Sequence, residues 1–264
     1  MKYVPKTIKN NPNISKVHPL TTFGKLLAGA LILVVTIYVL MGLFVGMLAP
    51  HVPVTVEKKL GDLFVATFTE GRLEAESARL QKMLDEMLPH LSPDDRRFNH
   101  TVTVVAKEEV NALALPGGHI VVFKGLLDEV ENEDEIRFVL AHELGHFNGR
   151  DHLLGLGRSL VTLTLSIVLF GNDSVATDFL FGTIRNVEMK FSQRQEVEAD
   201  LFALNVLART TKQCQGGTTF MERLAEQNKH SKLSYYFASH PHPKIRLKKL
   251  AEAIERNSDC TQRP

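Results

Sequence analysis

The amino-acid sequence predicts an α+β fold in which a mostly helical domain with a small β-sheet follows one N-terminal transmembrane helix. Three observations support this prediction. An uncharged apolar run lies near the N-terminus, three short strand-like runs lie between residues 101 and 123, and the flanking segments repeat apolar residues every three or four positions. The balance of 31 basic and 30 acidic residues argues against a nucleic-acid partner, because such proteins usually carry a basic surplus.

The apolar run at 26–49 is expected to cross a membrane. A helix of about 24 residues is roughly 36 Å long, which exceeds a hydrocarbon thickness of about 30 Å. A cleaved signal peptide would have a shorter apolar core, whereas here Pro50 follows a long run. Residues 1–25 contain lysines and no acidic residue, which predicts a cytoplasmic N-terminal segment. We therefore expect a single-pass protein of a cell inner membrane, with the rest of the chain periplasmic or otherwise extracytoplasmic.

The chain after the span is expected to divide into three parts: a helical linker and covering helix at 50–98, a main domain at 99–256 and a flexible tail at 257–264. Cys214 and Cys260 could pair in an oxidising compartment, but two cysteines alone leave the pairing open.

Short strands are predicted in three places: 101–106, 111–115 and 119–123. Pro116, Gly117 and Gly118 form the turn expected between the last two strands. Asn132 and Glu135 have the spacing of a helix cap, so a helix is predicted to begin there.

The predicted helix contains His142, Glu143 and His146 among apolar residues, in the pattern H-E-x-x-H. Positions i and i+4 share one face of a helix, so the two imidazoles can reach one point. A buried polar group without a partner destabilises a protein by about 1–3 kcal/mol. A metal ion satisfies both histidines, and this spacing is typical of zinc sites in which the glutamate is the general base.

A second predicted helix, at 191–208, places Glu196 and Asp200 at the centre of its apolar face. Glu198 lies on the polar side, where Arg194 is its expected ion-pair partner. Two buried carboxylates also need a cation or a donor. His142, His146 and Glu196 are therefore predicted to hold one Zn²⁺ per chain, and Asp200 is predicted to receive an imidazole N–H or to pair with a buried basic residue.

A further apolar stretch at 153–171 is interrupted by Arg158. If it crossed the membrane once, His146 and Glu196 would lie on opposite sides and could not share a metal. It is therefore expected to be a core helix near the membrane surface, with a re-entrant hairpin as the alternative.

Four ordered motifs carry a family resemblance: "NALALPGGHIVVFKGLL", "LAHELGHFNGRDH", "SQRQEVEAD" and "SHPHPKIRL". Together they resemble the zinc metallopeptidase family of the CAAX prenyl protease, HtpX and BepA, whose HExxH domain is of gluzincin type. The resemblance implies that Glu196 is the acidic ligand, and that His240 and Arg246 belong to a C-terminal His-Pro element near the site. Three roles are open for His240: it approaches the zinc, it stabilises an oxyanion, or it belongs to a turn that only caps a helix. The resemblance also implies an edge strand that binds an extended substrate, formed by Asn111, Ala112, Leu113, Ala114 and Leu115.

The predicted function is that of a membrane-anchored zinc endopeptidase that acts on protein or peptide substrates in envelope protein quality control. Glu143 is the predicted catalytic base. Two alternatives are a membrane-anchored binding module with a structural zinc, and a latent protease in which His240 occupies the water position. The oligomeric state and the physiological substrate are not predicted.

Overall fold

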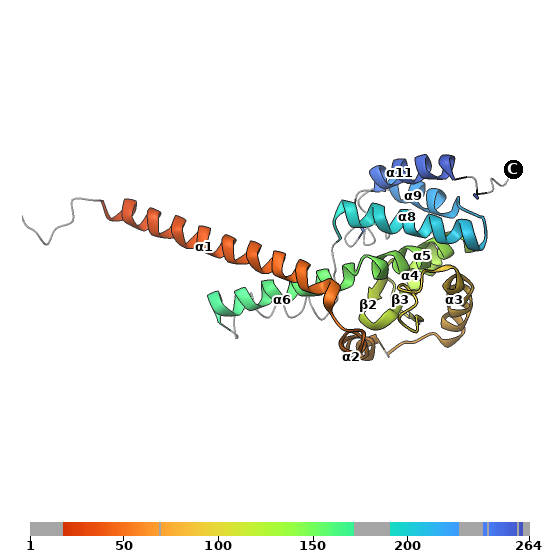
Figure 1. Ribbon diagram of the computed structural model, residues 1–264, viewed down its shortest axis with the longest axis horizontal. Helices are drawn as coiled ribbons and strands as arrows, with labels where there is room; N and C mark the ends of the chain where they lie inside the picture. Colours follow the sequence, from red (N-terminus) through yellow and green to blue (C-terminus); the bar gives the residue numbers. More distant parts are fainter. Residues whose placement is uncertain are drawn as a thin grey trace, which may run out of the picture.

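The computed structural model describes residues 18–68, 70–171, 191–226, 240–241, 243–257 and 259–260. A long N-terminal helix projects from a domain in which helices surround a small sheet (Figure 1). The α+β prediction is therefore confirmed. The helices used below are α1 Pro19–Leu48, α2 Val54–Val65, α3 Glu74–Met87, α4 Lys124–Glu129, α5 Glu133–Asn148, α6 Asp151–Phe170, α8 Gln193–Thr210, α9 Gly216–Glu226 and α11 Pro243–Arg256.

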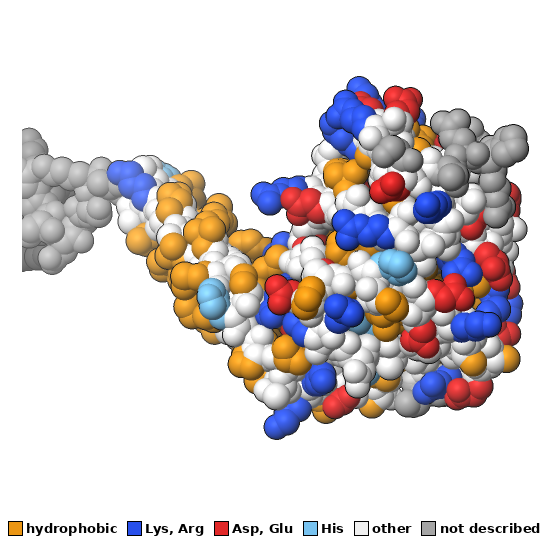
Figure 2. All heavy atoms as spheres, turned by 45° about the vertical axis from the view of Figure 1, so that its right-hand side comes forward, with side chains coloured by type: hydrophobic (Ala, Val, Ile, Leu, Met, Phe, Trp, Pro, Cys, Tyr) orange, Lys and Arg blue, Asp and Glu red, His pale blue; other side chains and the backbone are white. Residues whose placement is uncertain are grey.

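Helix α1 contains the predicted span and begins earlier, at Pro19, where the side chain of His18 caps it. None of its residues is buried against the domain. Apolar side chains cover α1, whereas charged side chains are scattered over the domain surface (Figure 2). Among the described residues, Pro19–His51 and α6 are the helical stretches long and apolar enough to cross a membrane.

The sheet has three strands in the order β1-β3-β2, with bounds Thr101–Val105, Ala112–Leu115 and His119–Phe123 for β1, β2 and β3. β1 is parallel to β3, and β2 is antiparallel to it. Gly117 and Gly118 have positive φ angles in the tight connection between β2 and β3, which glycine adopts without strain. The predicted strands and turn are confirmed, and β2 forms one edge of the sheet.

Helix α3 covers the opposite edge. The Ser77 hydroxyl accepts a hydrogen bond from the Val104 backbone N–H at 2.9 Å, and the Gln81 side chain accepts one from Val102 at 2.8 Å. The main apolar core lies where α3, α5 and α8 pack together with the sheet. Asn132 caps α5 by accepting from the Glu135 N–H, as its spacing predicts.

Helix α6 differs from the predicted core helix. Its first turns are buried, and Val161, Leu163 and Ser166 are buried further along, but its C-terminal end is exposed, with Val168 at 74% and Phe170 at 64%. It leaves the domain beside α1 (Figure 1). The prediction is wrong for this end of the helix, because apolar composition alone does not separate a protein core from an exposed apolar surface.

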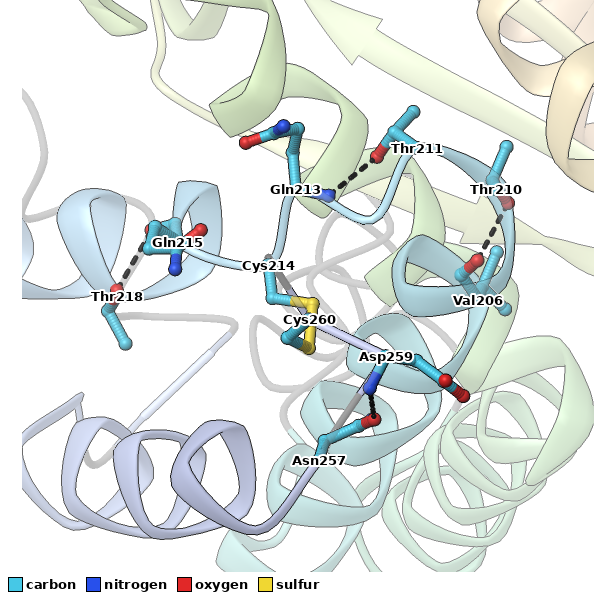
Figure 3. Close-up of a disulfide and its surroundings, with 10 residues drawn as sticks. All are labelled: Val206, Thr210, Thr211, Gln213, Cys214, Gln215, Thr218, Asn257, Asp259 and Cys260. Atoms are coloured by element: carbon cyan, nitrogen blue, oxygen red, sulfur yellow. Dashed lines mark hydrogen bonds between the residues drawn. A yellow bond between two sulfur atoms is a disulfide. The ribbon is translucent and has the colours of Figure 1, made fainter. Parts of the chain in front are cut away.

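Cys214 and Cys260 form a disulfide that joins the loop after α8 to the segment after α11 (Figure 3). The predicted flexible tail is therefore wrong at Cys260, because this bond and a backbone hydrogen bond to Asn257 hold it in place. Residues 258 and 261–264 of that tail lie outside the described residues.

Candidate metal centre

His142 and His146 lie one turn apart on α5 and are fully buried. Their Nε2 atoms are 3.2 Å apart. Glu196, from α8, places Oε2 3.6 Å from the His142 nitrogen and Oε1 3.6 Å from the His146 nitrogen. The structure thus brings the three predicted ligands to one point, although they come from two helices far apart in the sequence.

The other imidazole nitrogens lie beside carboxylates. His142 Nδ1 lies 2.9 Å from an Asp200 oxygen, and His146 Nδ1 lies 2.9 Å from an Asp151 oxygen. These contacts favour a proton on each Nδ1, so the two Nε2 lone pairs point toward each other and toward the Glu196 carboxylate. Lone pairs and a carboxylate repel unless a cation lies between them. The donor set therefore fits a metal ion, with nitrogen and oxygen ligands of the kinds that zinc takes.

Arg246, from α11, stabilises the acidic side of this cluster. Its guanidinium donates two hydrogen bonds to Asp200, each 2.7 Å long, and Nη1 lies 2.5 Å from Glu196. Burial alone would raise the pKa of Glu196, but the charges of His240 and Arg246 outweigh it and the pKa is lowered. Asp200 thus pairs with a buried arginine and also lies beside His142 Nδ1.

The protonation states suit a metal centre. Burial lowers the pKa of His142 to about 4, which keeps the imidazole neutral as a ligand must be. Burial raises the pKa of Glu143 to about 7, although the backbone of Ala114 in β2 favours its charged form. Neither Glu143 oxygen has a hydrogen-bond partner of ordinary geometry among the described residues. Glu143 is therefore a buried carboxylate available to exchange a proton near neutral pH.

His240 lies inside the cluster. Its Nδ1 is 3.1 Å from Glu196 and 3.3 Å from His142, and its Nε2 is 3.7 Å from Glu143. One ligand atom from each of four buried residues falls within 4.8 Å of the others: His142, His146, Glu196 and His240. The His-Pro element is thus next to the candidate metal position, as the resemblance implies.

Asp151 was not among the predicted site residues, but it bonds His146 Nδ1 and accepts a hydrogen bond from the side chain of Gln195. Phe191 was also missed, and its ring stacks on His146 with centroids 3.8 Å apart. Asp151 lies only five residues after His146, so an acidic residue just beyond the motif was an available signal. The stacking of Phe191 had none, because it depends on how α8 approaches α5.

The other predicted residues lie as follows. Glu198 is exposed and pairs with Arg194 at 2.7 Å, as predicted. Four residues of the predicted substrate strand, Ala112, Leu113, Ala114 and Leu115, form edge strand β2, and Asn111 precedes it.

A histidine pair and a glutamate on one helix, facing an acidic residue of a second helix, are typical of metallopeptidases. Fold and site together define this class of protein. The chain belongs to peptidase family M48, whose family model matches residues 74–254. The predicted family resemblance is thereby confirmed.

Similar proteins include mitochondrial metalloendopeptidases OMA1 and a β-barrel assembly-enhancing protease. The chain is 35% identical to OMA1 of Arabidopsis thaliana over 58% of this chain and 31% of that protein. It is 30% identical to OMA1 of Saccharomyces cerevisiae over 57% and 47%, respectively. For the β-barrel assembly-enhancing protease of Yersinia pestis the identity is 32%, over 54% of this chain and 32% of that protein. The alignments thus span from about a third to about half of these relatives.

Proposed function

We propose that this metallopeptidase is a zinc-dependent endopeptidase anchored in a membrane by α1, and that its substrates are proteins handled in quality control. The observation that carries the metal assignment is the convergence of two imidazole lone pairs and the Glu196 carboxylate, each fixed by a buried partner. Zinc is the ion that best suits two histidines and one carboxylate beside a glutamate base.

In this proposal His142, His146 and Glu196 hold the ion. When bound, zinc would supply Lewis acidity that makes a water molecule more acidic and polarises the scissile carbonyl. Glu143 takes the proton of the attacking water and transfers it to the leaving amine nitrogen. Asp200 and Asp151 keep the imidazoles in the tautomer that leaves Nε2 free for the ion.

The edge strand β2 is proposed to bind the substrate as an added strand. β2 is at the edge of the sheet, and the backbone of its residue Ala114 favours the charged form of the Glu143 carboxylate, which places β2 near that side chain. A peptide added beside β2 would therefore lie next to the base. Recognition through backbone hydrogen bonds selects extended chain more than particular side chains, which suits unfolded substrates. A similar protease of Yersinia pestis is named for enhancing β-barrel assembly, which motivates the proposal of envelope protein substrates.

We propose that the N-terminus is cytoplasmic and that the peptidase domain lies in the periplasm or another space outside the cytoplasm. The lysines before α1 and the absence of acidic residues in 1–25 support this orientation. The Cys214–Cys260 disulfide supports an oxidising compartment.

The test is the variant Glu143→Gln in the full chain. We expect it to retain stoichiometric zinc, measured by elemental analysis, while peptide cleavage falls by a factor of about 10²–10⁴ or more because the base is lost. Glu198→Gln, on the exposed side of α8, is the matched control and should cleave normally. Undiminished, chelator-resistant turnover by Glu143→Gln would contradict the proposal.

The comparisons do not favour the binding-module alternative, because relatives of the chain are named as proteases and endopeptidases and the family is a peptidase family. They give no support to the latent form either, and the role of His240 stays a prediction.

A further inference from the structure

The C-terminal half of α6 presents an apolar surface that the described part of the protein leaves uncovered. Four large apolar side chains are between about half and three quarters exposed: Leu160, Val168, Leu169 and Phe170. No charged residue occurs from 159 to 171. A contiguous exposed surface of this kind indicates an interaction partner.

The position of α6 beside α1 identifies that partner. At Gly157, a Cβ atom would lie only 2.4 Å from a methyl group of Val45, so the two helices approach closely there. The Arg150 guanidinium, just before α6, donates hydrogen bonds to the carbonyls of Ala49 and Val52 at 2.9 and 3.0 Å. These contacts fix α6 against the end of α1, and the two helices leave the domain together (Figure 1).

Two threonine hydroxyls in the C-terminal half of α6 do not oppose burial in lipid. The Thr162 hydroxyl donates to the Arg158 carbonyl at 2.9 Å, and the Thr164 hydroxyl donates to that of Leu160 at 2.8 Å. Both donors are therefore satisfied within the helix itself, which removes most of the unfavourable free energy of placing a hydroxyl in hydrocarbon.

We infer that α6 enters the phospholipid bilayer beside α1, with the exposed side chains of Leu160, Val168, Leu169 and Phe170 in contact with acyl chains. This inference rests on the proposed membrane insertion of α1. From Gly157 to Phe170 the helix rises by about 20 Å, enough to reach past the bilayer midplane. Phe191 stacks on His146, so the chain is back at the metal centre at that residue. α6 therefore inserts without separating the ligands of α5 and α8.

Insertion of α6 also places the metal centre. Asp151, which bonds His146, is the first residue of α6, and Arg150 binds the end of α1. The centre is thereby held close to the membrane surface, where it meets polypeptide segments that emerge from the bilayer.

The chain has no tryptophan, so single-tryptophan variants report their own surroundings. Phe170→Trp tests α6, Phe44→Trp on α1 is the control for a lipid-facing position, and Ile245→Trp on α11 is the control for an exposed apolar position of the domain. Each full-length variant is reconstituted in phosphatidylcholine–phosphatidylglycerol vesicles with acyl chains either brominated or not, and iodide is added from outside.

We expect acyl-chain bromination to reduce the emission of Phe170→Trp as much as that of Phe44→Trp, while iodide quenches only Ile245→Trp. Iodide quenching of Phe170→Trp, or insensitivity of its emission to bromination while Phe44→Trp responds, would overturn the inference. Insensitivity of Phe44→Trp would instead contradict the membrane insertion of α1, and with it the basis of the inference for α6.

Discussion

At the residue scale, the partner of Nδ1 in each imidazole sets the tautomer, and with it whether Nε2 has a lone pair to offer a metal ion. His142 and His146 are held through Nδ1 by Asp200 and Asp151, and both carboxylates have further partners of their own. The orientation of the two candidate histidine ligands is therefore fixed by neighbouring carboxylates that are not themselves candidate ligands.

Asp151→Asn tests this dependence. The amide can still occupy the same space, but it no longer offers a charged acceptor to His146, and we expect metal affinity to fall by about 10–100-fold. Competition with a fluorescent chelator measures the change. Glu198→Gln, an exposed acid on α8, serves as the control for loss of one negative charge. Equal affinities in the two variants would show that Asp151 does not position His146.

The metal-free protein should show the titration of Glu143. Its pKa in the folded state, about 7, exceeds the ordinary value of 4.5. The folded state therefore binds more protons than the unfolded state between these values, and stability falls as pH rises through this window. We expect Glu143→Gln to gain about 3 kcal/mol relative to the wild type on going from pH 4 to pH 8, because each pKa unit corresponds to about 1.4 kcal/mol. Denaturant unfolding in chelator measures both proteins, and parallel pH profiles would contradict the expectation.

At the element scale, the centre depends on how closely α5 and α8 approach. A Cβ atom at Gly145, within the H-E-L-G-H segment, would lie 2.7 Å from the Cα of Ala199. Both positions lie between residues of the candidate metal centre, so small side chains there let the histidines and Glu196 meet.

Gly145→Ala is therefore expected to push the two helices apart. Overpacking of this kind destabilises a protein by about 1–3 kcal/mol, and the longer distance from Glu196 to the imidazoles should weaken metal binding as well. Thermal unfolding and chelator competition measure the two effects. Gly29→Ala, at an α1 position with open space around it, should change neither. A fully stable, metal-loaded Gly145→Ala protein would disprove this account.

At the scale of the whole molecule, the disulfide fixes the C-terminal helix that carries Arg246. Cys214 and Cys260 are 46 residues apart, and Cys214 is completely buried (Figure 3). A cross-link over this distance restricts the unfolded chain and thereby stabilises the folded one. The bond lies on the side of the domain from which Arg246 reaches Glu196 and Asp200.

The double variant Cys214→Ser/Cys260→Ser is expected to lose about 4 kcal/mol of unfolding free energy, from the loop length alone. Denaturant unfolding of the full chain measures it, with the wild type in reductant as a second route to the same state. If oxidised wild type and double variant unfold at the same denaturant concentration, the bond contributes nothing to stability.

The sequence by itself determined the long apolar N-terminal helix, the strands, the two helices and the residues that face their interior. These features follow local patterns: an uncharged apolar run defines the N-terminal helix, and helical spacing alone puts His142, His146 and Glu196 on buried faces. Glu196 could be separated from Glu198 in this way, because the two lie on different sides of α8.

Only the tertiary structure decided which residues of different elements meet. The contact of Asp151 with His146, the stacking of Phe191 and the reach of Arg246 depend on helix packing that no local pattern encodes. The direction of α6 was decided in the same way. An apolar helix lowers its free energy equally by entering a protein core or a bilayer, so its neighbour α1, not its composition, determines where it lies.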